Sequence, residues 1–358
     1  MNLQTLQQYY GGKTVLLTGH TGFKGSWLLQ ILHMAGAKVH GLALAPEQPG
    51  DLYNTINGEA LCTSSTYADI RNSQMVLDKV LDVQPDIIFH LAAQPLVRRS
   101  YQEPAYTFEV NCQGTIHIME AMRSLDKPCI GIMITTDKVY ENFEDGRAYK
   151  EEDKLGGYDP YSASKAAAEI AISSYRNSFF NPKQYGKHHK ALAAARAGNV
   201  IGGGDFAADR IIPDIIRAIE HNQPVTLRNP GAVRPWQHVL EPLAGYLQLG
   251  IRLMEDPVQY AQGYNFGPET TDVLQVEVLT QAIIKVLEKG EYRIETLDHQ
   301  PHEAQLLMLD IAKAKTTLGW TPKLNALQAI EWTAQWYKTG TRDTSAACMN
   351  QIEQYFAL

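Results

Sequence analysis

Cysteine is scarce in this sequence, with four residues among 358, and none of them forms a C-x-x-C pair. Because Cys62, Cys112, Cys129 and Cys348 are far apart, we expect free thiols rather than disulfides. No apolar run approaches the roughly 20 residues that a membrane helix requires. The first ten residues also lack the charged and apolar segments of a secretion signal. We therefore expect a soluble, cytoplasmic protein with no membrane partner.

An excess of positive charge is missing as well. The formal net charge is -7 and no long basic run occurs, which argues against a nucleic-acid partner. His188 and His189 are adjacent, and adjacent side chains on a strand point to opposite faces. His299 and His302 lack the further ligands that a zinc site demands, so no metal is expected. The hydrophobic content of 44% is ample for a buried core in one large domain or two intimate ones.

The first half of the chain alternates between short apolar runs and helical segments. Strands are predicted at 13–18, 38–43, 86–91, 129–135 and 191–196, and helices at 27–34, 104–123 and 161–175. Apolar strands separated by helices are typical of a parallel sheet that is covered on both faces. The predicted fold class is α/β, with a doubly wound parallel sheet of the Rossmann type.

This rhythm breaks after about residue 200. Helices are predicted at 212–220, 242–254, 273–287 and 325–337, and a strand at 264–267 that returns to the sheet. We expect residues 1–200 and 237–268 to form the dinucleotide-binding domain. Residues 201–236 and 269–358 would form a smaller, interleaved C-terminal domain that completes a substrate cleft.

A glycine-rich loop follows the first predicted strand and opens the first predicted helix. Gly19, Gly22 and Gly25 have the spacing G-x-x-G-x-x-G, with Phe23 and Lys24 between the last two. Glycines allow the backbone to approach a pyrophosphate closely, and the helix N-terminus supplies free N–H groups. The pattern predicts a dinucleotide site, and the alternative is a purely structural turn.

The carboxylate that usually holds the adenosine ribose is absent after the second strand. The segment 41–46 contains no acid, and no arginine stands there for a 2′-phosphate, so the residues leave the choice between NAD and NADP open. Asp69 could accept a hydrogen bond from the adenine amine. Equally, it could cap the helix that starts near Asn72.

Two short strings carry the chemistry. Tyr161 and Lys165 are four residues apart on a predicted helix and therefore share one face, where Thr136 at the end of a strand can meet them. A tyrosine, with an ordinary pKa of about 10, becomes a usable base only when positive charge stabilises the phenolate. The next two residues, Asp137 and Lys138, offer an acid and a possible base for a second step.

These motifs resemble those of the extended short-chain dehydrogenase/reductase family. The resemblance includes Leu91-Ala92-Ala93-Gln94, Asn199, Arg234 and the segment 264–267, and it covers nearly the whole chain. Within the family, Thr136-Asp137-Lys138 is similar to the catalytic string of the sugar-nucleotide 4,6-dehydratases. Most of those relatives carry Asp-Glu at the last two places, so Lys138 departs from the pattern.

The resemblance implies NAD as cofactor and a nucleotide sugar as substrate, with cytidine as the base (CDP-glucose). The catalytic residues would be Thr136, Asp137, Lys138, Tyr161 and Lys165. The cofactor would be bound by Gly19, Gly22, Phe23, Lys24, Gly25, Asp69, Ile70, Leu91, Ala92, Ala93, Tyr161 and Lys165. The substrate would be bound by Gln94, Arg98, Asn199, Arg210, Arg234 and His302.

The implied reaction oxidises C4 of the sugar, removes water across C5 and C6, and returns the hydride to C6. Asp137 would be the acid, and Lys138 would be either the C5 base or a charge that stabilises the enolate. An epimerase or reductase of the same family would keep Tyr161 and Lys165 but has no use for the acid. A non-catalytic regulator would need neither. A homodimer or dimer of dimers, and a place in deoxysugar synthesis for a surface polysaccharide, are also implied.

Overall fold

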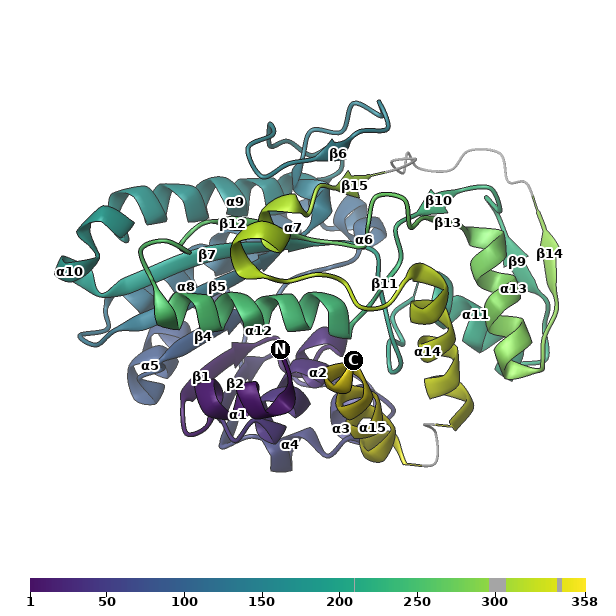
Figure 1. The fold of residues 1–358 in the computed structure, drawn as a ribbon, viewed down its shortest axis with the longest axis horizontal. Coiled ribbons are helices and arrows are strands. Elements are labelled where there is room, and N and C mark those ends of the chain that lie inside the picture. Colours follow the sequence, from purple (N-terminus) through teal and green to yellow (C-terminus); the bar gives the residue numbers. More distant parts are fainter. Residues whose placement is uncertain (209, 296–306, 340–342) are drawn as a thin grey trace.

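A seven-stranded parallel sheet forms the centre of the computed structural model (Figure 1), which describes residues 1–208, 210–295, 307–339 and 343–358. The strand order is β12-β7-β5-β4-β1-β2-β3, and every neighbouring pair is parallel. The predicted doubly wound α/β fold is confirmed. The strands are β1 Thr14–Thr18, β2 Lys38–Ala43, β3 Ser64–Tyr67, β4 Ile87–His90, β5 Cys129–Thr135, β7 Lys190–Ala197 and β12 Gly263–Phe266.

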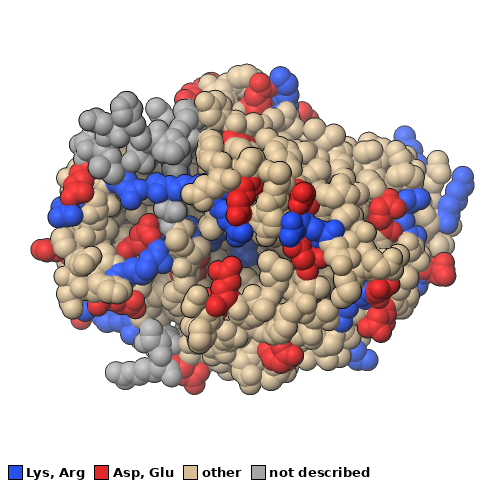
Figure 2. All heavy atoms as spheres, turned by 180° about the vertical axis from the view of Figure 1, so that it is seen from behind, with Lys and Arg blue, Asp and Glu red and all other residues tan. Residues whose placement is uncertain are grey.

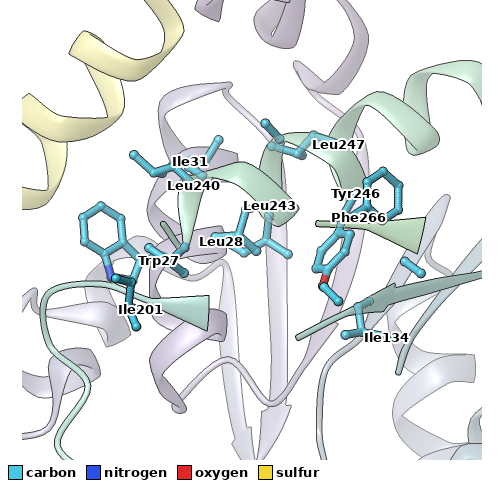
Figure 3. Packing of buried hydrophobic residues seen from close by; sticks show 14 of the residues in the cluster. Trp27, Leu28, Ile31, Ile134, Ile201, Leu240, Leu243, Tyr246, Leu247 and Phe266 are labelled. Atoms are coloured by element: carbon cyan, nitrogen blue, oxygen red, sulfur yellow. The ribbon is translucent and has the colours of Figure 1, made fainter. Parts of the chain in front are cut away.

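Both faces of this sheet are apolar, because side chains alternate between two cores along each strand. Leu16 and Ile88 enter one core, which is completed by α5 Ser73–Val83, α8 Gly114–Arg123 and α9 Pro160–Ser178. Val15 and Phe89 enter the other, which is completed by α2 Phe23–Met34 and α12 Leu240–Glu255. Figure 3 shows this second core, where side chains of α2 and α12 interlock above the sheet.

The helix predicted at 104–123 is interrupted in its middle. It consists of α7 Pro104–Phe108, a π-helical turn at Glu109–Gln113 and α8. The wider turn places Asn111 beside the loop after β4, where its amide accepts a hydrogen bond from Gln94 N (2.8 Å) and donates one to Gln94 O (3.0 Å). Such turns concentrate at functional sites, and periodicity alone does not reveal them.

The second half of the chain supplies small pairs of strands and several helices at one end of the sheet (Figure 1). The predicted helices are confirmed, although residues 274–275 form a strand rather than the start of a helix. The elements are β8 Val200–Ile201, α11 Ile211–Glu220, β9 Val225–Leu227, β10 Val233–Arg234, β11 Gln237–His238, β13 Leu274–Gln275, α13 Val276–Leu287, β14 Tyr292–Ile294, β15 Met308–Leu309 and α14 Ala326–Thr339.

Several elements were not predicted. The strand β3 reads Ser-Ser-Thr-Tyr and lacks an apolar run, so only its pairing with β2 defines it. The helices that the sequence analysis did not delimit are α1 Leu3–Tyr10, α3 Leu52–Thr55, α4 Gly58–Leu61, α5, α6 Val97–Gln102, α10 Tyr185–His188 and α15 Thr344–Ala357. The C-terminal helix α15 packs against α1, α2 and α3, next to the N-terminal half of the sheet.

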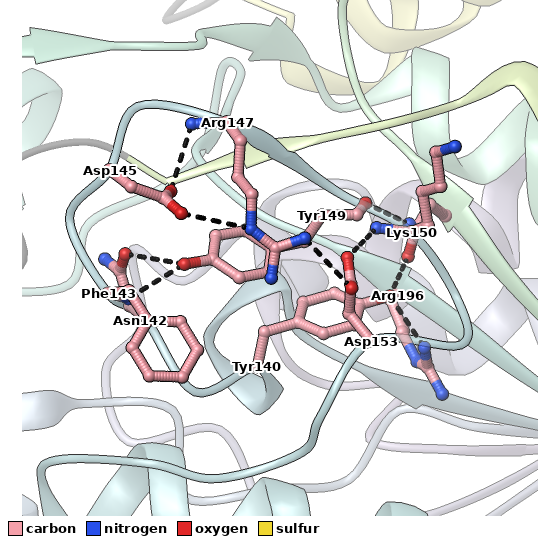
Figure 4. Close-up of polar contacts among 10 residues, drawn as sticks. Tyr140, Asn142, Phe143, Asp145, Arg147, Tyr149, Lys150, Asp153 and Arg196 are labelled. Carbon is pink, nitrogen blue, oxygen red and sulfur yellow. Dashed lines mark hydrogen bonds and ion pairs between the residues drawn. The ribbon is translucent and has the colours of Figure 1, made fainter.

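A polar segment between β5 and α9 projects from the molecule and contains β6 Ala148–Tyr149, which pairs with β15 (Figures 1 and 4). Side chains within this segment contact one another. The Arg147 guanidinium lies over the Tyr149 ring and pairs with Asp153 (3.0 Å).

All four cysteines are free thiols, as predicted. Within the described part of the chain, none of the helices combines the length and apolarity needed to cross a membrane.

Candidate active site

The predicted site residues gather at the carboxyl edge of the sheet, because parallel strands end on the same side. Gly19 follows β1, Leu91 follows β4, Thr136 follows β5 and Asn199 follows β7. The strand order reverses between β1 and β4, and the crevice at such a reversal is where open α/β sheets bind ligands.

The glycine loop is pressed against the loop after β4. Gly19 has a φ of 74°, and a Cβ there would lie 2.7 Å from Ala92 N and 2.9 Å from Leu91 C. A Cβ on Gly25 would lie 2.0 Å from Gly19 O. Gly22 precedes α2, whose first turn carries no acidic side chain. The first N–H groups of α2 can therefore bind a phosphate, so this cradle fits a dinucleotide pyrophosphate.

A buried chain of polar side chains, which the sequence analysis missed, fixes the two loops. Thr18 Oγ1 is 2.7 Å from His90 Nδ1, and His90 Nε2 is 3.1 Å from Thr115 Oγ1. Ala92 N donates to Thr18 Oγ1 (3.2 Å). Burial lowers the pKa of His90 to about 3, so its imidazole is neutral and serves as a structural link.

At the expected adenine end, Asp69 is held by its neighbour. Its carboxylate accepts hydrogen bonds from Arg71 N and Arg71 Nε, both at 2.9 Å. The cap of α5 is Asn72, whose Oδ1 accepts from Met75 N (3.1 Å), so the capping alternative for Asp69 was wrong. Contacts of Asp69 and Ile70 with a cofactor stay predictions.

The structure brings four of the five predicted catalytic residues together as buried groups. The exposed fractions of Thr136, Asp137, Tyr161 and Lys165 are 5%, 3%, 9% and 5%. Thr136 Oγ1 donates to Asp137 Oδ1 (2.8 Å). The helix α9 begins at Pro160, so Tyr161 lies in its first turn and Lys165 one turn later. Lys138 is half-buried beside them, in the short 3₁₀ turn Asp137–Val139.

The pKa values of Tyr161 and Lys165 depend on burial and on the charged groups around them. Burial raises the pKa of Tyr161 to about 12, while a hydrogen bond with Thr136 and the charge of Arg210 lower it and Asp137 raises it. Burial lowers the pKa of Lys165 to about 8, and Glu169 raises it. Lys165 Nζ donates to Ile134 O (3.2 Å).

Lys24 joins the cofactor loop to this group of charges. Its pKa is lowered to about 8, chiefly by burial and also by the cations of Arg210 and Lys165, while Asp137 and Asp205 act in the opposite direction. Arg210 is paired with Asp205 at 2.8 Å. Lys24 is thus influenced by both the Asp137 and the Arg210 charges, as Tyr161 is.

The two residues that follow β7, Gly198 and Asn199, contact the Asp137 carboxyl group. A Cβ on Gly198 would lie 2.0 Å from both Cγ and Oδ2 of Asp137, so the carboxyl group packs directly on the glycine backbone. Asn199, which has a φ of 51°, directs its Nδ2 to Asp137 Oδ2 (3.4 Å). The sequence predicted Asn199 as a substrate residue, but it gave no signal for Gly198.

The other predicted substrate residues lie in separate segments of the chain. The Gln94 amide is occupied by its own loop and by α7, since Nε2 donates to Leu96 O and Thr107 Oγ1 and Oε1 accepts from Leu96 N. Arg98 lies in α6, and Arg234 lies in β10 and donates to Val233 O (3.0 Å). His302 lies outside the described residues. Their contacts with substrate stay predictions. The rear view shows basic and acidic side chains around a hollow near the centre of that face (Figure 2).

Glu169 and Arg196 form a buried ion pair that the sequence analysis missed, and Glu169 raises the pKa of Lys165. Glu169, one turn further along α9, accepts from Arg196 Nε (2.9 Å), Arg196 Nη2 (2.8 Å) and Thr135 Oγ1 (2.6 Å). Arg196 also donates to the Tyr140 hydroxyl group (2.6 Å), and both residues are seen in Figure 4. The spacing of four residues from Lys165 to Glu169 could have indicated from the sequence that both lie on one face of the helix.

The sequence of this chain matches that of known proteins. The sequence model described as GDP-mannose 4,6 dehydratase matches residues 16–333. CDP-glucose 4,6-dehydratase of Salmonella typhimurium is 42% identical over 354 residues, covering 98% of this chain and 98% of the relative. The chain belongs to the GDP-mannose 4,6 dehydratase family.

Solved structures share the fold. The dTDP-glucose 4,6-dehydratase DesIV from Streptomyces venezuelae, solved with NAD and DAU bound, has a TM-score of 0.74 at 22% identity and covers 92% of this chain and 98% of its own. The epimerase Mth375 from Methanothermobacter thermautotrophicus has a TM-score of 0.80 at 21% identity, with 95% and 96% covered. These likenesses confirm the Rossmann-type fold predicted from the sequence.

Proposed function

We propose that this protein converts CDP-glucose into CDP-4-keto-6-deoxyglucose and water, with NAD as its resident cofactor. The observation that carries the proposal is the buried group of Thr136, Asp137, Tyr161 and Lys165 beside the dinucleotide cradle. The 42% identity to a CDP-glucose 4,6-dehydratase over nearly the whole of both chains supports this substrate.

The cradle fits NAD because the close approach of Gly19 to Ala92 leaves backbone, rather than side chains, facing the crevice. Bound NAD would accept a hydride from C4 of the sugar and later return it to C6. The residues that would bind it are Gly19, Gly22, Phe23, Lys24, Gly25, Asp69, Ile70, Leu91, Ala92, Ala93, Tyr161 and Lys165.

Tyr161 would take the proton from the C4 hydroxyl group. Its phenol has a raised pKa, so deprotonation depends on neighbouring positive charge and on hydrogen bonds to the phenolate. Lys165 supplies that charge from one turn along the same helix. Thr136 would bind the same sugar oxygen and orient it.

Asp137 would act as the acid in the loss of water. A base removes the C5 proton, the C5–H electron pair becomes the C5–C6 double bond, and the C6–O bond breaks as Asp137 protonates the leaving oxygen. Lys138 is the candidate base, and a charged Lys138 that stabilises the enolate is the alternative. If Lys138 is the base, the Lys138→Met variant stops exchanging the C5 proton with deuterated solvent. Exchange at the normal rate would remove that role.

The sugar diphosphate needs cations and hydrogen-bond donors. Arg210 lies close enough to influence Tyr161 and Lys24, and Asn199 contacts Asp137, so both would face the sugar and its phosphates. Arg98, Arg234, Gln94 and His302 would complete the site. Residues 201–236 and 269–358 would form the sugar-nucleotide domain around it, and residues 1–200 and 237–268 the dinucleotide domain.

We also propose a cytoplasmic homodimer, or dimer of dimers, formed through the helices at 104–123 and 160–178. Apolar side chains are exposed on these helices, with Ile170 at 60% and Phe108 at 38%, and Phe179 at the end of the second helix is 43% exposed. Light scattering at micromolar concentration should show at least a dimer, and a monomer alone would contradict the proposal. The keto-deoxy product would feed the synthesis of deoxysugars such as those of a lipopolysaccharide O-antigen.

The decisive assay incubates the protein with CDP-glucose and NAD and then adds alkali, which reveals a 4-keto-6-deoxy sugar by its ultraviolet absorbance. CDP-, UDP-, dTDP- and GDP-sugars offered at equal concentration establish the preferred base. We expect CDP-glucose to be consumed first, with a loss of mass equal to one water. A stereoisomer of unchanged mass would instead indicate an epimerase.

A further inference from the structure

Gln237 joins the ends of two neighbouring strands directly behind the proposed acid. The residue lies in β11 and is 1% exposed. Its Nε2 donates to Gly198 O (2.9 Å), just after β7, and to Phe266 O (3.1 Å), at the end of β12. Its backbone N–H donates to Asn199 O (3.2 Å).

The two residues that Gln237 holds after β7 are the same two that touch the Asp137 carboxyl group. Gly198 lies directly under the carboxyl group, and Asn199 donates to its Oδ2. A shift of this backbone by a few tenths of an ångström would therefore move or release the carboxyl group. No hydrogen bond joins Gln237 to Asp137 among the described residues, so any influence passes through Gly198 and Asn199.

The orientation of the Gln237 amide follows from its partners, because a flipped amide would point its oxygen at two carbonyl oxygens. Its Oε1 is buried and has no hydrogen-bond donor among the described residues. Gln237 and Asp137 line one cavity of about 10 Å³, with room for about one water molecule.

We propose that Gln237 is a positioning residue for the acid step of the dehydration. It fixes Gly198 and Asn199 so that the Asp137 carboxyl group faces the C6 oxygen when the C6–O bond breaks. The inference rests on the proposed function, and it adds a residue that acts only on the protonation of the leaving hydroxyl group. Oxidation at C4, which depends on Tyr161 and Lys165, should not need it.

The test compares two leaving groups in the same enzyme. The variant Gln237→Met keeps the volume of the side chain but removes both donors. With CDP-glucose we expect kcat to fall roughly 10- to 100-fold, because general acid catalysis typically contributes 10² to 10⁴-fold and only its positioning is lost. With CDP-6-deoxy-6-fluoroglucose, where fluoride leaves without being protonated, kcat should stay near wild type. KM should change little for either substrate.

Gln30→Met is the matched control. Gln30 is also 1% exposed, its Nε2 also donates to a backbone carbonyl (Ser345 O, 3.2 Å), and its Oε1 also lacks a partner in the described chain. We expect its melting temperature to fall comparably while kcat with CDP-glucose is unchanged. In the Asp137→Asn background, Gln237→Met should cause no further loss. Equal losses with both substrates, or additive losses in the double variant, would overturn the proposal.

A second measurement separates this inference from the proposed function. If wild type eliminates neither water from CDP-glucose nor hydrogen fluoride from the fluoro analogue, the proposed function fails. The positioning role is then decided by crystal structures of wild type and Gln237→Met, compared at Gly198 and Asp137. We expect the Gly198 carbonyl and the Asp137 carboxyl group to shift together in the variant. An unmoved Asp137 carboxyl group would refute the positioning role.

Discussion

Replacing Glu169 with glutamine should destabilise the protein and also weaken the base. Glu169 is 3% exposed and is bonded twice to Arg196, which is itself 6% exposed. In Glu169→Gln an amide N–H₂ group would face a guanidinium donor, and the buried cation would lose its counter-charge. Breaking a buried pair from one side typically costs roughly 3 to 5 kcal/mol. We expect a loss of that size in urea unfolding at pH 7.

The same variant should alter the pH dependence of catalysis. Glu169 raises the pKa of Lys165, which burial has lowered to about 8. Without the carboxylate that pKa falls, the Lys165 ammonium is lost at a lower pH, and the alkaline limb of the rate profile moves toward neutrality. The pKa of Glu169 is held below its ordinary value by Arg196 against the effect of burial. The stability gap between wild type and variant should therefore narrow at acidic pH, where the native carboxylate becomes protonated.

The control is the exposed pair of Arg293 and Glu295, whose side chains are 59% and 42% exposed. Glu295→Gln should change the unfolding free energy by less than about 1 kcal/mol and leave the rate profile unchanged. If Glu169→Gln proved as mild as this control, the buried pair would not have the structural role argued for it. An unmoved alkaline limb would show that Glu169 does not influence Lys165 in the working enzyme.

Three further predictions concern the cradle, the base and a buried acid away from the site. Gly19→Ala places a Cβ 2.7 Å from Ala92 N at a φ of 74°, so added NAD should no longer raise the melting temperature. Tyr161→Phe should keep that NAD-dependent rise but lower kcat by roughly 10² to 10⁴-fold. Burial raises the pKa of Glu241 from 4.5 to about 7, so the native state binds this proton more tightly than the unfolded chain. Stability should therefore fall as pH rises between those values, by about 3 kcal/mol in total, and Glu241→Gln should lack this slope.

Each of these predictions has a clear contrary result. A normal NAD-dependent rise in Gly19→Ala would mean that the loop can move away from Ala92. Near-normal turnover in Tyr161→Phe would remove the proposed base. Parallel stability curves for wild type and Glu241→Gln would show that this carboxyl group is already ionised near its ordinary pKa in the folded protein.

The sequence predicted those parts of the fold that short-range patterns specify. The bounds of β2 and β5 were predicted to the residue, and β5 shows the reason most clearly, since it is a continuous apolar run. The strand β3 was not delimited, since its polar residues owe their conformation to pairing with β2. The π turn at Glu109–Gln113 has no periodic signature, because Asn111 is drawn to Gln94 by tertiary hydrogen bonds.

The site divides in the same way. Tyr161 and Lys165 were predictable because one helix carries both. The contacts of the Asp137 carboxyl group were not predictable from the sequence. Gly198 and Gln237 are distant from Asp137 in the chain, and Gln237 acts on it through the backbone of Gly198 and Asn199. Glycine at 198 looks like any loop glycine until the carboxyl group is seen 2.0 Å from where its Cβ would be.

The contacts of Thr136 link the proposed acid, Asp137, to the proposed base, Tyr161. Thr136 has one hydroxyl proton, which in this structure is donated to Asp137 Oδ1 (2.8 Å), while the charge of Asp137 raises the pKa of Tyr161 and the hydrogen bond with Thr136 lowers it. If Asp137 carries a proton, that opposing charge is gone and the Thr136 hydroxyl group can donate to the phenolate alone. In the proposed mechanism, the proton that Asp137 would carry to expel water would thus also favour the earlier removal of the alcohol proton. This coupling gives a physical reason for an acid placed directly after the threonine that serves the base.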